Sequence, residues 1–253
     1  EVFRAEFKEY KKLCVPADRG GRQQFLRALM NVRKPGPMSV EVLAVQDAYL
    51  RERAEEKGIV DLQDIPVICE GLSVCQSDIT RLAVDAIVNA ANSAMLGCFV
   101  PGHNCIDNCI QTYAGVQMRA ECDRQMKLLK REYGQSYVQP TAIPLLTDGY
   151  NLPAKKVVHI VCPVVTGSLT QKHKTELAAC YTNTLDLCMR EGFKSLAFCC
   201  ISTGVFHFPN EAAAEIAVNT VRGWQETHGN AMERIVFNVF KDEDKKCCET
   251  LMR

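Results

Sequence analysis

The chain has 253 residues, of which 47% are hydrophobic and 24% are charged, so it can bury a large core. Its 30 Lys and Arg residues balance 30 Asp and Glu residues, and without a net positive field we expect no nucleic-acid partner. Apolar runs such as Leu196–Ile201 fall well short of the roughly 20 residues of a membrane-spanning helix, so we expect no membrane association either.

The first part of the chain, residues 1–64, predicts a small helical extension. Apolar residues recur at helical spacing in residues 25–30 and again in residues 42–49. The sequence Pro35-Gly36-Pro37 separates these two stretches and predicts a break between two helices.

From residue 65 onward, short runs of Val, Ile and Cys alternate with longer amphipathic segments. Several runs are apolar on both faces, as expected of strands that helices cover on both sides. Residues 213–224 follow the spacing of a helix that packs on such a sheet. The prediction is a three-layer α/β/α domain over residues 65–253, with strands at Pro66–Val74, Asp85–Asn89, Val157–Val165, Ser195–Ile201 and Ile235–Phe240.

The chain contains 14 cysteines, most of them in apolar strand-like or helical surroundings. Reduced thiols in such positions behave as small core hydrophobes, so we do not expect a disulfide scaffold. This pattern favours a reducing intracellular compartment, and we expect the cytoplasm.

Three predicted strand ends carry polar residues. Asp78 follows the first strand, and Asn89 and Asn92 follow the second, where they either tie loops together or meet a polar ligand. After the strand at Ser195–Ile201, the small residues of Ser202-Thr203-Gly204 allow backbone N–H groups to approach an anion near a helix N-terminus. The same three residues also suit a plain turn.

The stretch GCFVPGHNCID, residues 97–107, concentrates reactive side chains on a segment that cannot be a regular helix. Cys98, His103 and Cys105 form C-x4-H-x-C, a ligand set suited to zinc. Three protein ligands leave one position open for substrate or water. Two alternatives remain: a structural site completed by Cys109 or Cys122, and three incidental residues without a metal.

The sequences SDITRLAVDAIVNAAN, GYNLPAKKVVHIVCP and ISTGVFHFP resemble, in this order, the macrodomain, a module that binds ADP-ribose at the strand ends of a mixed sheet. Catalytic macrodomains of the MacroD type carry a glycine-rich stretch where this chain has GCFVPGHNCIDNCI. That difference, together with the helical extension, is similar to the zinc-dependent macrodomain subfamily, in which a Cys/His loop holds the metal beside the distal ribose.

The resemblance implies roles for individual residues. Asp78, with the Ile79 backbone nearby, would bind the adenine amine, although Asp78 also suits a helix cap. Asn92 would contact the distal ribose, and Cys105 would also contact ADP-ribose, whereas Asn89 is interpreted as a structural tie. The diphosphate loop would consist of Ser202, Thr203, Gly204, Val205 and Phe206, with the Phe206 ring against the distal ribose or simply in the core.

Asp107 matches the acidic residue that MacroD-type enzymes keep beside the scissile ribose, where it would orient or activate a water. An Asp in the first turn of a helix is also stabilising for electrostatic reasons alone. No role is assigned to His159, His173, His207 or His228.

The resulting prediction is a monomeric, zinc-dependent hydrolase that removes mono-ADP-ribose from proteins, ester-linked at acidic side chains. Asp107 and Asn92 would be catalytic, and Zn²⁺ would be the cofactor. Two alternatives stay open: a non-catalytic ADP-ribose reader and an O-acetyl-ADP-ribose deacetylase. Fold alone does not separate them, because macrodomains host both binding and catalysis.

Overall fold

The computed structural model describes residue 10, residues 12–204 and residues 206–253. Its main feature is a six-stranded mixed sheet in the order β2-β8-β7-β4-β6-β5. Every neighbouring pair in this sheet is parallel except β5 and β6, which are antiparallel. The strands are β2 (Leu72–Gln76), β4 (Ala86–Ala91), β5 (Leu145–Asp148), β6 (Lys156–Val161), β7 (Ser195–Phe198) and β8 (Arg234–Val239).

The central strands are buried on both faces. All four residues of β7 are buried, as are five of the six residues of β4. A strand can be apolar along its whole length only if helices cover both sides of the sheet.

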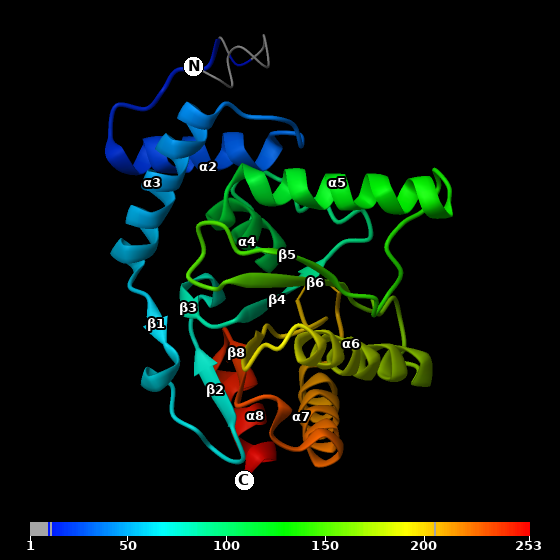
Figure 1. Ribbon diagram of the computed structural model, residues 1–253. Helices are drawn as coiled ribbons and strands as arrows, with labels where there is room; N and C mark the ends of the chain where they lie inside the picture. Colours follow the sequence, from blue (N-terminus) through cyan, green and yellow to red (C-terminus); the bar gives the residue numbers. More distant parts are fainter. Residues whose placement is uncertain (1–9, 11, 205) are drawn as a thin grey trace.

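Two groups of helices supply that cover (Figure 1). On one face lie α4 (Ile106–Ala114) and α5 (Val116–Tyr133), which contact each other and the strands β4 and β5. On the other face α6 (Gln171–Arg190), α7 (Asn210–His228) and α8 (Asp242–Met252) pack together. The predicted three-layer α/β/α architecture with a mixed sheet is therefore confirmed.

The predicted N-terminal helices are present as α2 (Arg19–Val32) and α3 (Val40–Lys57). Side chains cap both N-termini: Asp18 accepts from the Gly21 amide and Ser39 from the Val42 amide. Both helices pack against α4, on the outside of that layer (Figure 1).

After α3 the chain continues into β1 (Val60–Asp61), which pairs in parallel with β3 (Leu82–Ala83). The extension thus also joins the domain through its backbone, and the boundary at residue 64 stays a prediction. Between residues 62 and 231 the chain also forms the short 3-10 helices η2 (Leu62–Asp64), η3 (Ile79–Arg81) and η4 (Gly229–Ala231).

Two predicted strand boundaries were wrong. The strand placed at Pro66–Val74 begins at Leu72, because the chain turns at Gly71. Gly71 has a φ of 77°, and a Cβ there would lie 2.8 Å from the Glu233 carbonyl oxygen. The strand placed at Val157–Val165 ends at Val161, two residues before Pro163, which lacks the N–H that a ladder needs.

The other three predicted strands differ by smaller margins: β7 stops at Phe198 rather than Ile201, β4 ends at Ala91 rather than Asn89, and β8 ends at Val239 rather than Phe240. One strand, β5, was not predicted at all. All fourteen cysteines lie among the described residues and are free. In the described part of the chain, no helix is both long and apolar enough to cross a membrane.

Candidate functional site

The sheet topology brings the predicted site residues to one edge. Because β2, β4, β7 and β8 run parallel, their carboxyl ends meet there, and ligands of open α/β sheets bind at this edge. Asp78 follows β2, the segment 92–105 follows β4, and the segment 199–209 follows β7.

The residues Cys98, His103 and Cys105 come together as predicted. Their three candidate ligand atoms all lie within 4.8 Å of one another, and Cys98 Sγ is 3.6 Å from His103 Nδ1. Among the described residues this is the one cluster of three or more His, Cys, Asp or Glu side chains with this geometry. Two sulfurs and an imidazole nitrogen so close together fit zinc in number and in chemistry.

Local structure explains how the loop folds back. The His103 amide donates to the Val100 carbonyl, and Gly102 between them has a φ of 66°, a conformation that favours glycine. Cys105 is the N-cap of α4, and its sulfur accepts from the Asn108 amide at 3.4 Å. Burial raises the pKa of the Cys105 thiol, and the neighbouring Cys98 raises it further.

The two alternative ligands lie outside the cluster. Cys109 Sγ is 3.6 Å from a guanidinium nitrogen of Arg27. Cys122 is buried on α5, with its sulfur 3.9 Å from Nε2 of His159. Neither cysteine therefore belongs to the group of three whose ligand atoms lie within 4.8 Å of one another.

Asp107 lies in the first turn of α4 and is only 5% exposed. Two amide groups hold its carboxylate: Asn89 Nδ2 donates to Oδ1 at 2.8 Å, and Asn92 Nδ2 donates to Oδ2 at 3.3 Å. Burial raises the pKa of Asp107 to about 6, while the donation from Asn89 and the nearby charge of Arg119 act in the opposite direction. The structure thus joins Asp107 and Asn92, which sequence analysis had named as a pair.

A buried network continues behind Asp107. Asn89 is paired with His159 in the register of β4 and β6, and its Nδ2 lies 3.0 Å from His159 Nδ1. Because the Asn89 amide donates, Nδ1 accepts and the proton is assigned to Nε2, which lies 2.9 Å from Thr147 Oγ1. Asn89 is thus the structural tie that was expected. The place of His159 in this network was missed, although a polar pair in two adjacent apolar strands is a signal that could have revealed it.

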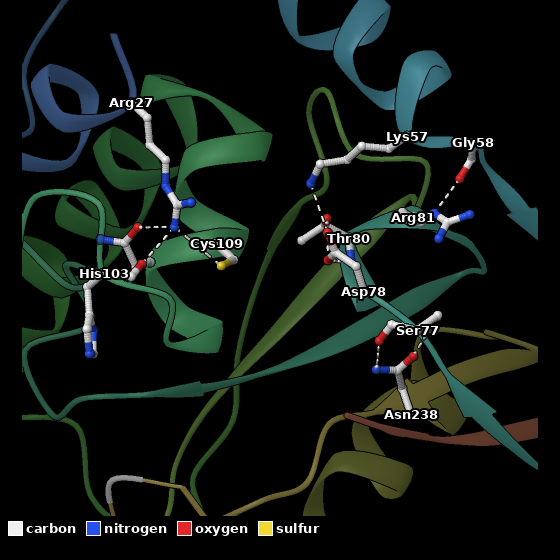
Figure 2. A network of polar contacts seen from close by, with 11 residues as sticks. Arg27, Lys57, Gly58, Ser77, Asp78, Thr80, Arg81, His103, Cys109 and Asn238 are labelled. Carbon is white, nitrogen blue, oxygen red and sulfur yellow. Dashed lines mark hydrogen bonds and ion pairs between the residues drawn. The ribbon is translucent and has the colours of Figure 1, made fainter. Parts of the chain in front are cut away.

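At the other end of this edge, Asp78 caps the short helix η3. Its Oδ1 accepts from the Thr80 amide at 3.0 Å and from the Thr80 hydroxyl at 2.6 Å. Its Oδ2 forms an ion pair with Lys57 Nζ at 2.8 Å, at the end of α3 (Figure 2). Partial burial favours the neutral acid, but the hydrogen bonds from Lys57 and Thr80 outweigh it and lower the pKa of Asp78.

The loop that carries Asp78 is also fixed to the sheet. The Ser77 hydroxyl donates to Asn238 Oδ1 at 3.0 Å, and Asn238 Nδ2 donates back to the Ser77 carbonyl at 2.9 Å (Figure 2). Ile79 is buried, with 1% of the residue exposed, and the ligand role of its backbone stays a prediction. The capping role of Asp78 is therefore present, and its ligand role stays a prediction.

The segment after β7 turns sharply before α7. Ser202 is 2% exposed with a φ of 67°, and its carbonyl accepts from the Phe208 amide at 3.0 Å. Thr203 Oγ1 donates to the Cys200 carbonyl at 3.2 Å. A positive φ is unfavourable for a residue other than glycine, so the surrounding contacts must hold Ser202 in this conformation. Such strained residues are frequent at ligand sites.

The remaining residues of this predicted diphosphate loop are partly described. The Phe206 carbonyl accepts from the Val165 amide at 2.9 Å, and the Phe206 side chain is half-buried against the core. Val205 lies outside the described residues. The loop leads into α7 near Asn210, as the sequence predicted.

Comparison with known proteins gives consistent results. Residues 88–217 match the family described as Macro domain. The chain is 46% identical over 256 residues to a protein-ADP-ribose hydrolase of Treponema medium, spanning 100% of this chain and 95% of the relative. It is 43% identical over 245 residues to a protein-ADP-ribose hydrolase of Staphylococcus aureus strain MRSA252, spanning 96% of this chain and 89% of the relative. A solved macrodomain of Trypanosoma brucei in complex with ADP-ribose matches with a TM-score of 0.67 at 26% identity, spanning 90% of this chain and 95% of that one.

Proposed function

The chain belongs to the macrodomain family of protein-ADP-ribose hydrolases, and we propose that it removes mono-ADP-ribose, ester-linked at acidic side chains, in a zinc-dependent reaction. One observation carries this proposal. The cluster of Cys98, His103 and Cys105 lies at the start of α4, and the buried carboxylate of Asp107 lies in the first turn of the same helix. A metal site with an open position and a positioned carboxylate are then held by one structural element.

The three loops at the sheet edge suit the parts of ADP-ribose. Asp78 and the Ile79 backbone would bind adenine, and the segment Ser202–Phe206 would bind the diphosphate near the N-terminus of α7. Asn92 and Asp107 would then face the distal ribose, whose C1″ carries the ester. ADP-ribose as the ligand is supported by the solved T. brucei macrodomain, whose structure is a complex with ADP-ribose.

The residues Cys98, His103 and Cys105 would hold the zinc. When bound, zinc would supply a Lewis acid that polarises the ester and lowers the barrier to attack by water.

The chain's own residues would orient the reactants. Asp107 would accept a hydrogen bond from the attacking water, and Asn89 and Asn92 would fix the direction of its two oxygens. The overall reaction adds one water across the ester, so that the side-chain carboxylic acid and free ADP-ribose are released.

Further proposals concern the state of the protein. We propose that it acts as a monomer in a reducing compartment, most simply the cytoplasm. Fourteen free cysteines support the reducing compartment, because exposed thiols such as Cys14 would be oxidised elsewhere. Size-exclusion chromatography with light scattering would test the monomer.

The decisive experiment is a release assay. The protein is incubated with a carrier protein ADP-ribosylated at glutamate, untreated, after chelation, and after zinc is added back, and free ADP-ribose is measured by mass spectrometry. We expect release that chelation abolishes and zinc restores. Tight ADP-ribose binding without release would identify a reader, and release of acetate from O-acetyl-ADP-ribose without release from protein would identify a deacetylase. Full release after complete metal removal would contradict zinc dependence.

A further inference from the structure

A buried asparagine of the helical extension contacts the loop between β4 and α4, which carries Cys98, His103 and Cys105 and is called the zinc loop below. Asn31, near the end of α2, is 1% exposed. Its Oδ1 accepts from the Gly102 amide at 2.9 Å, and its Nδ2 donates to Thr112 Oγ1 on α4 at 2.7 Å. One side chain therefore joins α2, the loop and α4.

An arginine on the same helix contacts the loop one residue further along. A terminal guanidinium nitrogen of Arg27 donates to the His103 carbonyl at 2.7 Å and to Asn108 Oδ1 at 3.2 Å (Figure 2). The same nitrogen is 3.6 Å from Cys109 Sγ. Arg27 thus bonds to the backbone of the candidate ligand His103 and also contacts Cys109, the cysteine considered as a fourth ligand.

Asn108 on α4 also bonds to the loop. Its Nδ2 donates to the Val100 carbonyl at 3.0 Å and to the Cys98 carbonyl at 3.3 Å. A segment without regular structure must satisfy its backbone groups in other ways, and here they bond to side chains of two helices. Half of this framework belongs to the extension.

The extension is itself anchored at this point. Arg119 on α5 donates to the carbonyls of Met30, Asn31 and Arg33, at 3.2, 2.8 and 2.6 Å, where α2 ends. The guanidinium also lies over the Phe99 ring of the loop, 4.3 Å from its centroid. A buried cation on the last carbonyls of a helix is favourable, so the position of α2 relative to the loop is well determined.

We propose that Arg27 and Asn31 are positioning residues of the zinc loop, and that the extension acts to hold Cys98, His103 and Cys105 in their ligating arrangement. This inference rests on the proposed function, because it requires that the loop bind zinc. Without the side chains of Arg27 and Asn31, the loop loses its hydrogen bonds to α2 and is less ordered before zinc binds. Zinc binding must then order the loop, and the entropy lost in doing so weakens the affinity for the metal. Partners beyond the ligands themselves typically change metal affinity by about 10- to 100-fold when removed.

The test compares zinc affinities measured by competition with a chromophoric chelator. Arg27→Met and Asn31→Leu keep much of the side-chain volume but remove the bonds to the loop, and each should bind zinc about tenfold more weakly than the unaltered protein. The control is Arg22→Met on the same helix, where the exposed guanidinium bonds the Ala17 carbonyl, and it should bind zinc normally. Thermal melting without zinc and calorimetry with ADP-ribose report whether the domain stays intact.

A second readout separates positioning from a general loss of structure. Excess zinc should restore hydrolysis by Arg27→Met but not by His103→Ala, which lacks a ligand. If Arg27→Met does not fold, Arg27→Lys is used in its place. Lysine keeps the charge but not the guanidinium that donates to both the His103 carbonyl and Asn108 Oδ1, so zinc affinity should still fall.

The outcomes distinguish the two proposals. Unchanged zinc affinity in both Arg27→Met and Asn31→Leu would overturn the positioning role and leave the proposed function intact. An unaltered protein that binds no zinc would overturn the zinc-dependent function itself. Equal weakening by Arg22→Met would show that any change on α2 has this effect, and would also overturn the specific role of Arg27.

Discussion

Two carboxylates mark the two ends of the candidate site, and their surroundings differ. The side chain of Asp78 is 37% exposed and forms an ion pair with Lys57. Asp107 is buried, and the groups that hold it are the uncharged amides of Asn89 and Asn92. Correspondingly, the pKa of Asp78 is lowered, whereas burial raises that of Asp107.

This difference suggests a division of tasks. A permanently charged, partly exposed carboxylate suits a constant hydrogen bond to a ligand, and that contributes to affinity. A buried carboxylate next to a candidate metal loop suits the reacting centre. We therefore expect substitutions at the two ends to separate binding from turnover, and each prediction below would break or sharpen this separation.

The largest effect on hydrolysis should follow from loss of a candidate zinc ligand. His103→Ala removes one of three candidate ligands, and a Lewis acid is worth several kcal/mol, so hydrolysis should fall by about a thousandfold or more. ADP-ribose should still bind through the Asp78 end, and the α/β core should unfold cooperatively, because its strands bury their apolar surface without the loop. Elemental analysis, the release assay and calorimetry measure the three properties. An active variant without zinc would remove the metal from the mechanism.

The next effect concerns Asp107 with the metal retained. Asp107→Ala should slow single-turnover release by about a hundredfold or more, the range for loss of a positioned acid or base, while zinc content stays near that of the unaltered protein. A matched control is Asp123→Ala on α5, where the carboxylate pairs with Lys127 at the surface. If Asp107→Ala retained full turnover, the carboxylate would serve only to begin α4, and the comparison of the two ends would fail.

A smaller effect is expected at the Asp78 end. Asp78→Ala should weaken ADP-ribose binding by about 1.5 kcal/mol, roughly tenfold, the lower end of the range for bonds to charged groups, because Asp78 is partly exposed. Turnover at saturating substrate should not change. Lys57→Met removes the ion pair together with the contact of Lys57 Nζ with the Tyr113 ring, and it should have a weaker effect on binding, since exposed ion pairs contribute about 1 kcal/mol or less. Unchanged calorimetric affinity in Asp78→Ala would remove this residue from the site.

The edge on which the site lies could be predicted from sequence. Strands such as Ala86–Ala91 and Ser195–Phe198 are apolar on both faces, which indicates covering helices and a largely parallel sheet. Parallel strands place the loops that follow them at one edge, so the sequence could assign Asp78, Asn92 and Ser202 to the same edge of the sheet. The ends of strands were less accurate, because the apolar run at Pro66–Val74 continues through a turn.

The framework around the loop could not be predicted in the same way. Arg27 and His103 are 76 residues apart, and no periodic pattern links a helix surface to a distant carbonyl. From the sequence, the extension was therefore interpreted as a separate helical element, although the structure places its side chains against the loop of the candidate zinc ligands. His159 was missed for a related reason: its role depends on the register that pairs it with Asn89, and a single sequence does not specify that register.

The last prediction concerns the stability of the fold rather than binding or turnover, and it is made at His159, which lies behind the Asp107 end. The imidazole is fully buried, and burial lowers its pKa from 6.5 to about 3. The groups that face it are Asn89 on β4, Thr147 on β5 and Cys122 on α5, with the Asp107 carboxyl beyond Asn89. No cation or anion contacts the ring directly among these neighbours, so the folded protein keeps it neutral.

The sign of the pH effect follows from where the proton binds. Below pH 6.5 the unfolded chain protonates His159 and the folded chain does not, so the stability that this neutral histidine contributes is present above pH 6.5 and is lost as the pH falls toward 3. The loss approaches about 1.4 kcal/mol per pH unit. It is measured as the difference in urea unfolding free energy between the unaltered protein and His159→Gln from pH 7.5 to 5. Asp107 titrates in both proteins, so its contribution largely cancels. A difference that stays constant with pH would mean that His159 is protonated in the fold, and Asn89 would then have to turn its oxygen toward the ring and release Asp107.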